Sequence, residues 1–234
     1  MAMATNFCHQ LLGAFLTILV LQPLVVKSRL MKLESPRNHG QGQSNCDSLG
    51  GGVGGPTSDG LLHNTLSSGR WYNFPVTYGF RSGYVVPSGL DPQVVTTVID
   101  VAFGKWKAAI PDPQFAFQRI TPGDNANIKI TFAPLPGYYG YGYYPPNGNL
   151  SLDNSHTSWS TKPTPAGNEV DLLSGVLNTI GHTLGLEDST DPTAVMYPTL
   201  KYGSIKRNLS PDDISRIQNL YYYSRPHLEL AKPL

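Results

Sequence analysis

The sequence predicts a single α+β domain in which three helices accompany a twisted, mostly parallel sheet. Two observations predict this class. Short alternating or β-branched segments are interspersed with three stretches whose apolar residues recur every three or four positions. The order is a strand, a helix and then further strands, which implies a right-handed crossover. We therefore expect the first helix to pack on one face of the sheet.

The first strand and the first helix are predicted within residues 76–109. Val76–Phe80 alternates apolar with small residues and precedes a Ser-Gly turn signal, which indicates a strand. Asp91 is a suitable N-cap, and Pro92 occupies the first helical position. The apolar residues that define the first helix are Val95, Ile99, Ala102, Trp106 and Ala109.

The middle of the chain predicts three more strands and a loop. Phe115–Ile120 and Ile128–Phe132 are alternating or β-branched runs bounded by turn residues, and Leu150–Asp153 is a shorter run of the same kind. Gly137–Pro146 is rich in tyrosine and glycine and follows neither period. We interpret this biased segment as a loop.

Two helices are predicted in the last third of the chain. Glu169–Leu184 carries leucine and isoleucine at four-three-four spacing, and Gly185 follows as a C′ residue would. Ser210 is an N-cap candidate before Pro211, and two carboxylates in the next two positions favour the helix dipole. The apolar residues of this third helix are Ile214, Ile217, Leu220 and Tyr221.

Composition limits the classes of function. The 234 residues carry 17 Lys+Arg against 16 Asp+Glu, a formal net charge of +1, which argues against an electrostatic nucleic-acid binder. With 40% hydrophobic residues the chain can bury one core. Cys8 and Cys46 are its two cysteines, so a disulfide framework is excluded. We expect a monomer.

Residues 1–28 are predicted to form a secretory signal peptide. Leu11–Val26 is apolar but interrupted by Gln22-Pro23, so it is shorter than the roughly 20 residues of a stable membrane span. Small residues including Ser28 suit a cleavage site, which would start the mature chain near Arg29 and remove Cys8. We expect a secreted protein, located in the extracellular space or the cell wall.

The rest of the chain divides into a leader, a domain and a tail. Residues 29–68 are polar and glycine-rich, with a Gly-rich run at Gly50–Pro56, and are predicted to be a flexible leader. Residues 69–225 form the predicted domain, and residues 226–234 form a tail. Cys46, in the leader, is either a free thiol or an intermolecular partner.

One segment resembles a known motif. Asn178–Asp188 reads N-T-I-G-H-T-L-G-L-E-D, and Met196-Tyr197-Pro198 begins fourteen residues after His182. This pattern resembles the plant branch of the matrix metalloproteinases, which are matrixins (peptidase M10) within the metzincins. Their motif is H-E-x-G-H-x-x-G-x-x-H, followed by a Met-turn. The resemblance extends from Arg70 to Arg225 and implies a metzincin-like domain, with a zinc-site helix followed by a Met-turn. The leader would then be a truncated or degenerate propeptide.

The resemblance assigns places in the zinc site, but three of them carry other residues. His182 matches the second zinc ligand, Gly185 the turning glycine and Met196 the Met-turn. Asn178 stands in place of the first histidine, Thr179 in place of the general-base glutamate, and Asp188 in place of the third histidine.

These replacements change the expected chemistry. Carboxylate is a competent zinc ligand, but a neutral amide is a poor one, so we expect zinc binding to be weak or absent. Thr179 cannot act as a general base near neutral pH. We therefore expect no catalytic residue in this chain, and we interpret it as a degenerate member of the family. His182 and Met196 would then be a polar remnant on the helix and a core residue.

The other metal sites and the latency switch that the resemblance implies are also altered. Gly137–Pro146 contains no histidine where the family holds a structural zinc, and Asp153 keeps a calcium-ligand place beside His156 instead of an acid. We expect both structural zinc and calcium to be absent. Pro36–Gly40 lacks the cysteine of the family's Pro-Arg-Cys-Gly latency motif.

Three functions remain open. The first is a secreted pseudoprotease that binds an extracellular protein or wall component through its cleft or its tyrosine-rich segment. The second is an atypical zinc metalloendopeptidase acting on extracellular matrix or wall proteins. The third is a wall protein cross-linked through tyrosines. Asn149 begins a glycosylation sequon and Asn208 a second one that the following Pro211 weakens, and both fit a secreted glycoprotein. A weaker resemblance to legume nodulin-type members would imply a role in nodulation.

Overall fold

The computed structural model describes residues 28–34 and 69–223. Most of the predicted signal peptide, most of the leader and nearly all of the tail lie outside these residues. Within them, no helix is long and apolar enough to cross a membrane. The apolar segment Leu11–Val26 is outside the described part.

The described strands form a seven-stranded sheet and a two-stranded one. The large sheet has the order β3-β2-β4-β6-β5-β1-β9, and the small sheet pairs β7 with β8 in parallel. β3, β2, β4 and β6 are parallel, whereas β5 runs antiparallel to β6. The predicted mostly parallel sheet is therefore confirmed. The strands are β1 (Ser28–Glu34), β2 (Val76–Phe80), β3 (Phe117–Arg119), β4 (Ile128–Ala133), β5 (Tyr138–Tyr143), β6 (Asn149–Asp153), β7 (Trp159–Ser160), β8 (Val170–Asp171) and β9 (Thr199–Lys201).

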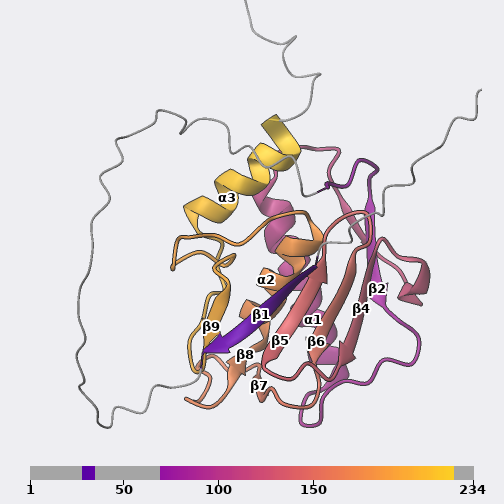
Figure 1. Ribbon diagram of the computed structural model, residues 1–234. Helices are drawn as coiled ribbons and strands as arrows, with labels where there is room; N and C mark the ends of the chain where they lie inside the picture. Colours follow the sequence, from indigo (N-terminus) through magenta and orange to yellow (C-terminus); the bar gives the residue numbers. More distant parts are fainter. Residues whose placement is uncertain (1–27, 35–68, 224–234) are drawn as a thin grey trace, which may run out of the picture.

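The three predicted helices are confirmed in the described residues. They are α1 (Pro92–Ala109), α2 (Leu172–Thr183) and α3 (Pro211–Gln218). α2 begins later than Glu169 because Val170–Asp171 is strand β8 and Asp171 is the N-cap. α1 packs against α2, and α2 also contacts β5 and β6. In Figure 1 both helices lie behind the sheet, and α3 lies at its upper end.

The interpretation of Gly137–Pro146 as a loop is wrong, because Tyr138–Tyr143 is strand β5. Its period of two is carried by glycine instead of by apolar residues. Gly140 and Gly142 are buried against α2, where a Cβ on Gly142 would lie 2.7 Å from the Thr179 carbonyl oxygen. The strand can approach the helix this closely only because these positions lack side chains.

The prediction of a flexible leader over residues 29–68 is wrong at its start. Ser28–Glu34 is strand β1, which pairs antiparallel with β5 and parallel with β9. Strand pairing uses backbone groups, so a segment that lies in a largely polar stretch of sequence can still join a sheet. Met31 is fully buried, whereas Lys32 is exposed. Residues 35–68 lie outside the described part.

Candidate functional site

Helix α2 carries three of the predicted site residues on buried positions. Asn178, Thr179 and His182 are each at most 2% exposed. The start of the helix is fixed by Asp171, whose side chain accepts hydrogen bonds from the Ser174 amide and hydroxyl. Asp171 is also paired with Arg207, and this carboxylate raises the pKa of the guanidinium. α2 is therefore held in one position relative to the loop before α3.

His182 and Asp188 are brought together. His182 Nδ1 lies 2.7 Å from the Leu186 carbonyl oxygen, which can only accept, so Nδ1 carries the hydrogen. The other ring nitrogen, Nε2, lies 3.5 Å from Asp188 Oδ1. A carbonyl acceptor on one ring nitrogen is the arrangement that orients many metal-binding histidines. The ring of Tyr144 covers the imidazole edge-to-face at 5.9 Å.

The side-chain amide of Asn178 bonds backbone outside helix α2. Its Nδ2 group donates to the carbonyl oxygens of Val195 at 2.8 Å and Tyr197 at 3.4 Å. Because carbonyls only accept, these bonds fix which end of the amide points to the loop. Asn178 Oδ1 is buried and has no hydrogen-bond partner among the described residues. Asn178 therefore ties α2 to the loop that contains Met196.

The hydroxyl of Thr179 is committed to its own helix. Oγ1 donates to the Gly175 carbonyl oxygen, four residues back, at 2.8 Å. Gly140 of β5 lies directly over it, since a Cβ there would come within 2.9 Å of Oγ1. This buried, hydrogen-bonded hydroxyl has no capacity to accept a proton near neutral pH.

Gly185 and Met196 shape the surroundings of His182. Gly185 has a φ of +105°, and its amide donates to the His182 carbonyl at 2.9 Å. This turn brings Leu186 back to the imidazole. Met196 is fully buried under α2, and a Cβ on Gly181 would be 2.2 Å from its sulfur. Met196 thus fills the space beneath the site helix.

A residue outside the predicted site fixes the Met196 loop. Asp213 is buried at the start of α3 and accepts hydrogen bonds from the amides of Val195 at 2.8 Å and Met196 at 3.0 Å. The sequence predicted for Asp213 only a favourable interaction with the dipole of the third helix. Its contact with the loop spans 17 residues of chain, so local spacing gives no signal for it.

The residues present do not fit a catalytic zinc ion. Such a site needs three protein donors around one open position. Among the described residues, no three His, Cys, Asp or Glu side chains gather into a group that could hold a metal. Asn178, the remaining candidate, bonds the loop through its Nδ2 group, and a neutral amide oxygen is a poor zinc donor.

Asp153 is used as the centre of a turn. Its two oxygens accept from the amides of Leu135, His156 and Thr157 at 2.6–2.8 Å. Burial alone would raise the pKa of Asp153, but these backbone hydrogen bonds outweigh it and lower the pKa to about 2. His156 is exposed, with Nδ1 3.6 Å from the carboxylate. The carboxylate of Asp153 is therefore hydrogen-bonded to its own turn through both oxygens.

We expect Asp153→Asn to destabilise the fold in a pH-dependent way. The pKa falls from 3.8 to about 2 on folding, so the carboxylate contributes stability above pH 3.8 that disappears as pH falls to about 2. The difference in unfolding free energy should be about 2 kcal/mol at pH 6, because one pKa unit corresponds to about 1.4 kcal/mol and the Asp153 side chain is fully buried. Urea titrations between pH 6 and pH 2 measure it. A gap that does not narrow below pH 4 would contradict this role, and Ser158→Ala, at an exposed position nearby in the chain, is the control.

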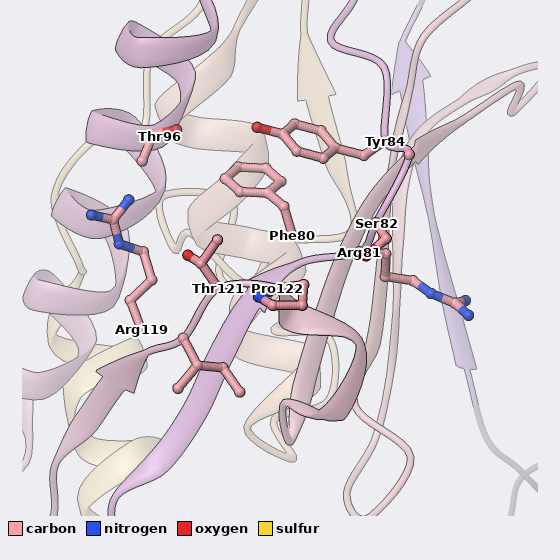
Figure 2. Close-up of a pocket in the computed structure, with 10 residues that line it drawn as sticks. Phe80, Arg81, Ser82, Tyr84, Thr96, Arg119, Thr121 and Pro122 are labelled. Carbon is pink, nitrogen blue, oxygen red and sulfur yellow. The ribbon is translucent and has the colours of Figure 1, made fainter.

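The cavity in Figure 2 lies apart from the predicted site residues. It has a volume of about 220 Å³ and is lined by the end of β2, the start of α1 and the segment after β3. The rings of Phe80 and Tyr84 stack at 4.3 Å beside it, and Arg119 is 3.6 Å from Asp100. Arg81 points away from the cavity (Figure 2). None of the predicted site residues lines it.

The two sequons differ in exposure. Asn149 is half-buried at the start of β6, and its amide donates to Asn147 Oδ1 at 3.1 Å. Asn208 is exposed, and its Oδ1 accepts from Lys105 Nζ at 3.0 Å. Of the two, Asn208 has the more accessible side chain for a glycan.

Comparison with known proteins identifies relatives of the domain. The Matrixin family (peptidase M10) matches residues 70–222. The chain is 36% identical over 159 residues to metalloendoproteinase 4-MMP of Arabidopsis thaliana, which covers 62% of this chain and 45% of the relative. It is 36% identical over 134 residues to metalloendoproteinase 1 of Glycine max, covering 51% and 43%. With metalloendoproteinase 1-MMP of Arabidopsis thaliana it shares 31% over 175 residues, covering 68% and 47%. The chain thus spans somewhat less than half the length of these relatives.

Proposed function

The chain belongs to the matrixin family, and from this premise we propose that it is a pseudoprotease that binds an extracellular protein or wall component without cleaving it. The observation that carries the proposal is the hydrogen bonding of the Thr179 and Asn178 side chains. The Thr179 hydroxyl donates to the Gly175 carbonyl, and the Asn178 amide donates to Val195. Both groups are buried and bonded to backbone carbonyls. The family's chemistry needs a general base in place of Thr179 and a zinc ligand in place of Asn178.

The extracellular location is part of this proposal. It is supported by the predicted signal peptide of residues 1–28 and by an accessible sequon at Asn208. The names of the plant relatives describe endoproteinases, which act on proteins. A protein partner is therefore the class that a retained matrixin fold would bind.

A second candidate is an atypical zinc metalloendopeptidase. It is favoured by one observation, the orientation of His182, whose Nδ1 bonds the Leu186 carbonyl while Nε2 faces Asp188. Imidazole and carboxylate are both competent zinc ligands. This function would need a further donor and a base from outside the described residues or from the substrate.

A restored site separates the two functions. We expect the wild-type chain, supplied with zinc, to leave a fluorogenic peptide uncleaved. The triple variant Asn178→His/Thr179→Glu/Asp188→His should gain chelator-sensitive hydrolysis, about 10²–10⁴-fold above a base-free variant. That base-free control is Asn178→His/Asp188→His, which restores the ligands alone. About one zinc per wild-type chain together with chelator-sensitive turnover would instead establish the second candidate.

A further inference from the structure

The cavity of Figure 2 is a second candidate site, away from helix α2. It lies between the end of β2, the first turns of α1 and the segment that follows β3. Its volume of about 220 Å³ is below the roughly 300–1,000 Å³ of sites for drug-sized ligands. The cavity therefore suits one small molecule, or one unit of a polymer whose chain continues into solvent.

The charge that lines the cavity is positive. Arg81 and Arg119 line it, and among the described residues none that lines it is acidic. Arg81 Nε is 4.0 Å from Asp124, and the Arg81 side chain points away from the cavity (Figure 2). Arg119 instead extends along α1 towards Thr96 (Figure 2). Arg119 is therefore the cation that a ligand in the cavity would meet.

Asp100 orients the guanidinium group of Arg119. Its Oδ1 lies 3.6 Å from Arg119 Nε and accepts a hydrogen bond from the Tyr78 hydroxyl at 2.8 Å. Burial and this bond raise the pKa of Tyr78, so the phenol remains a donor at neutral pH. With Nε turned to Asp100, the two terminal amino groups of Arg119 can bind the carboxylate of a ligand in the bidentate geometry that guanidinium favours.

Hydroxyl groups and aromatic rings form much of the remaining wall. Tyr84, Thr96 and Thr121 line the cavity from three different segments. The ring of Phe80 stacks on that of Tyr84 at 4.3 Å. The Thr96 hydroxyl donates to the Pro92 carbonyl at 2.8 Å, so its oxygen can still accept a hydrogen bond. Such hydroxyls suit a ligand that carries hydroxyls itself, and aromatic rings pack against the carbon-bound hydrogens of a sugar ring.

These features together favour one class of small anion. An acidic peptide side chain would use the arginine but not the hydroxyls, and an aromatic acid would use the arginine and the rings alone. A sugar acid uses all three. We propose that the cavity binds a uronic acid, free or as a unit of an acidic polysaccharide, with its carboxylate on Arg119 and its hydroxyls towards Thr96 and Thr121. The inference goes beyond the proposed function, because no residue of α2 lines the cavity.

Titration of the full chain with D-galacturonic acid, followed by saturation-transfer nuclear magnetic resonance of the ligand, tests the site. D-galactose has the same ring without the carboxylate, and we expect it to bind at least about ten-fold more weakly, because the charge-assisted hydrogen bonds are lost. Arg119→Gln should weaken binding of the acid to a similar extent. The matched control Arg81→Gln removes the same charge from a side chain that points away, and should keep the affinity within about two-fold.

A second pair of variants tests the hydroxyl contacts. Thr96→Val and Thr97→Val each remove a hydroxyl that donates to the carbonyl four residues earlier, at 2.8 and 2.9 Å, so both lose the same kind of bond within α1. Only Thr96 lines the cavity. We expect Thr96→Val to weaken binding of D-galacturonic acid about 2–10-fold and Thr97→Val to leave it unchanged.

A trimer of galacturonic acid separates the two sources of the ligand. Tighter binding of the trimer than of the monomer assigns the cavity to an acidic polysaccharide, whereas equal affinities assign it to the free acid. Both results support the proposed chemistry.

Equal binding of D-galactose and D-galacturonic acid would overturn the proposal, as would no binding of either D-galacturonic or D-glucuronic acid. Equal losses for Arg119→Gln and Arg81→Gln would show attraction to a general positive surface and also overturn it. Tighter binding of benzoate or glutarate would assign the cavity to another class of acid. None of these results bears on the pseudoprotease, because a uronic acid contains no peptide bond, and cleavage of the fluorogenic peptide would leave the cavity in place.

Discussion

Asp213→Ala is expected to lower the free energy of unfolding by about 3–5 kcal/mol. The carboxylate accepts four hydrogen bonds, from the amides of Val195, Met196 and Ser210 and from the Ser210 hydroxyl, at 2.7–3.0 Å. Alanine would leave two loop amides buried without an acceptor and remove half of the capping box of α3. Urea unfolding at neutral pH, followed by far-ultraviolet circular dichroism, measures the loss.

Asp212→Ala is the matched control, one residue earlier on the same helix. Its carboxylate accepts from the Ser189 hydroxyl at 2.7 Å and lies 3.8 Å from Arg216, with a third of the side chain exposed. Such a partly solvated interaction contributes about 1 kcal/mol or less. Similar losses for the two variants would show that the Met196 loop does not depend on Asp213.

The helices could be predicted because their signals are local. Asp91 and Ser210 cap the helices that follow them, and apolar residues three or four apart define the buried faces of all three helices. β2 and β4 were predictable for the same reason, since their side chains alternate. In these elements propensity, capping and packing all favour one structure.

Five of the described strands were not predicted, and the two longest of them, β1 and β5, depend on contacts made elsewhere in the fold. β5 is a strand because glycines at 140 and 142 let it lie against α2, and a glycine carries no apolar signal of its own. β1 is a strand because its backbone pairs with β5 on one side and with β9 on the other. Neither condition can be seen in the segment itself, because both are properties of the assembled sheet.

The residues of the site were predictable by position, but their interactions were not. The motif placed Asn178, Thr179 and His182 on one helix, and the structure brings His182 to Asp188 as the turn at Gly185 requires. The sequence did not indicate the hydrogen-bond partner of each side chain. The amide of Asn178 bonds a loop 17 residues away, and the hydroxyl of Thr179 bonds its own helix.

Gly185→Ala is expected to cost about 3 kcal/mol or more, for two separate reasons. At a φ of +105° an alanine is strained by roughly 1–2 kcal/mol. Its Cβ would also lie 2.4 Å from the Gly69 carbonyl oxygen, which belongs to the backbone and cannot rotate away. The segment around Gly69 would have to move. Trp71 would move with it, which would disturb the hydrogen bond from its indole NH to the Thr183 carbonyl at 2.9 Å.

Gly89→Ala separates strain from collision. Gly89 has a similar left-handed φ of +87°, but a Cβ there would meet no atom within 4 Å. The Gly89→Ala variant should therefore lose only the stability that the strained backbone costs, roughly 1 kcal/mol. Thermal and urea unfolding of both variants measure the difference, which isolates the contact between the turn after α2 and residue 69. If the two losses are equal, the start of the domain does not hold this turn, and the position of Leu186 beside His182 depends on the turn alone.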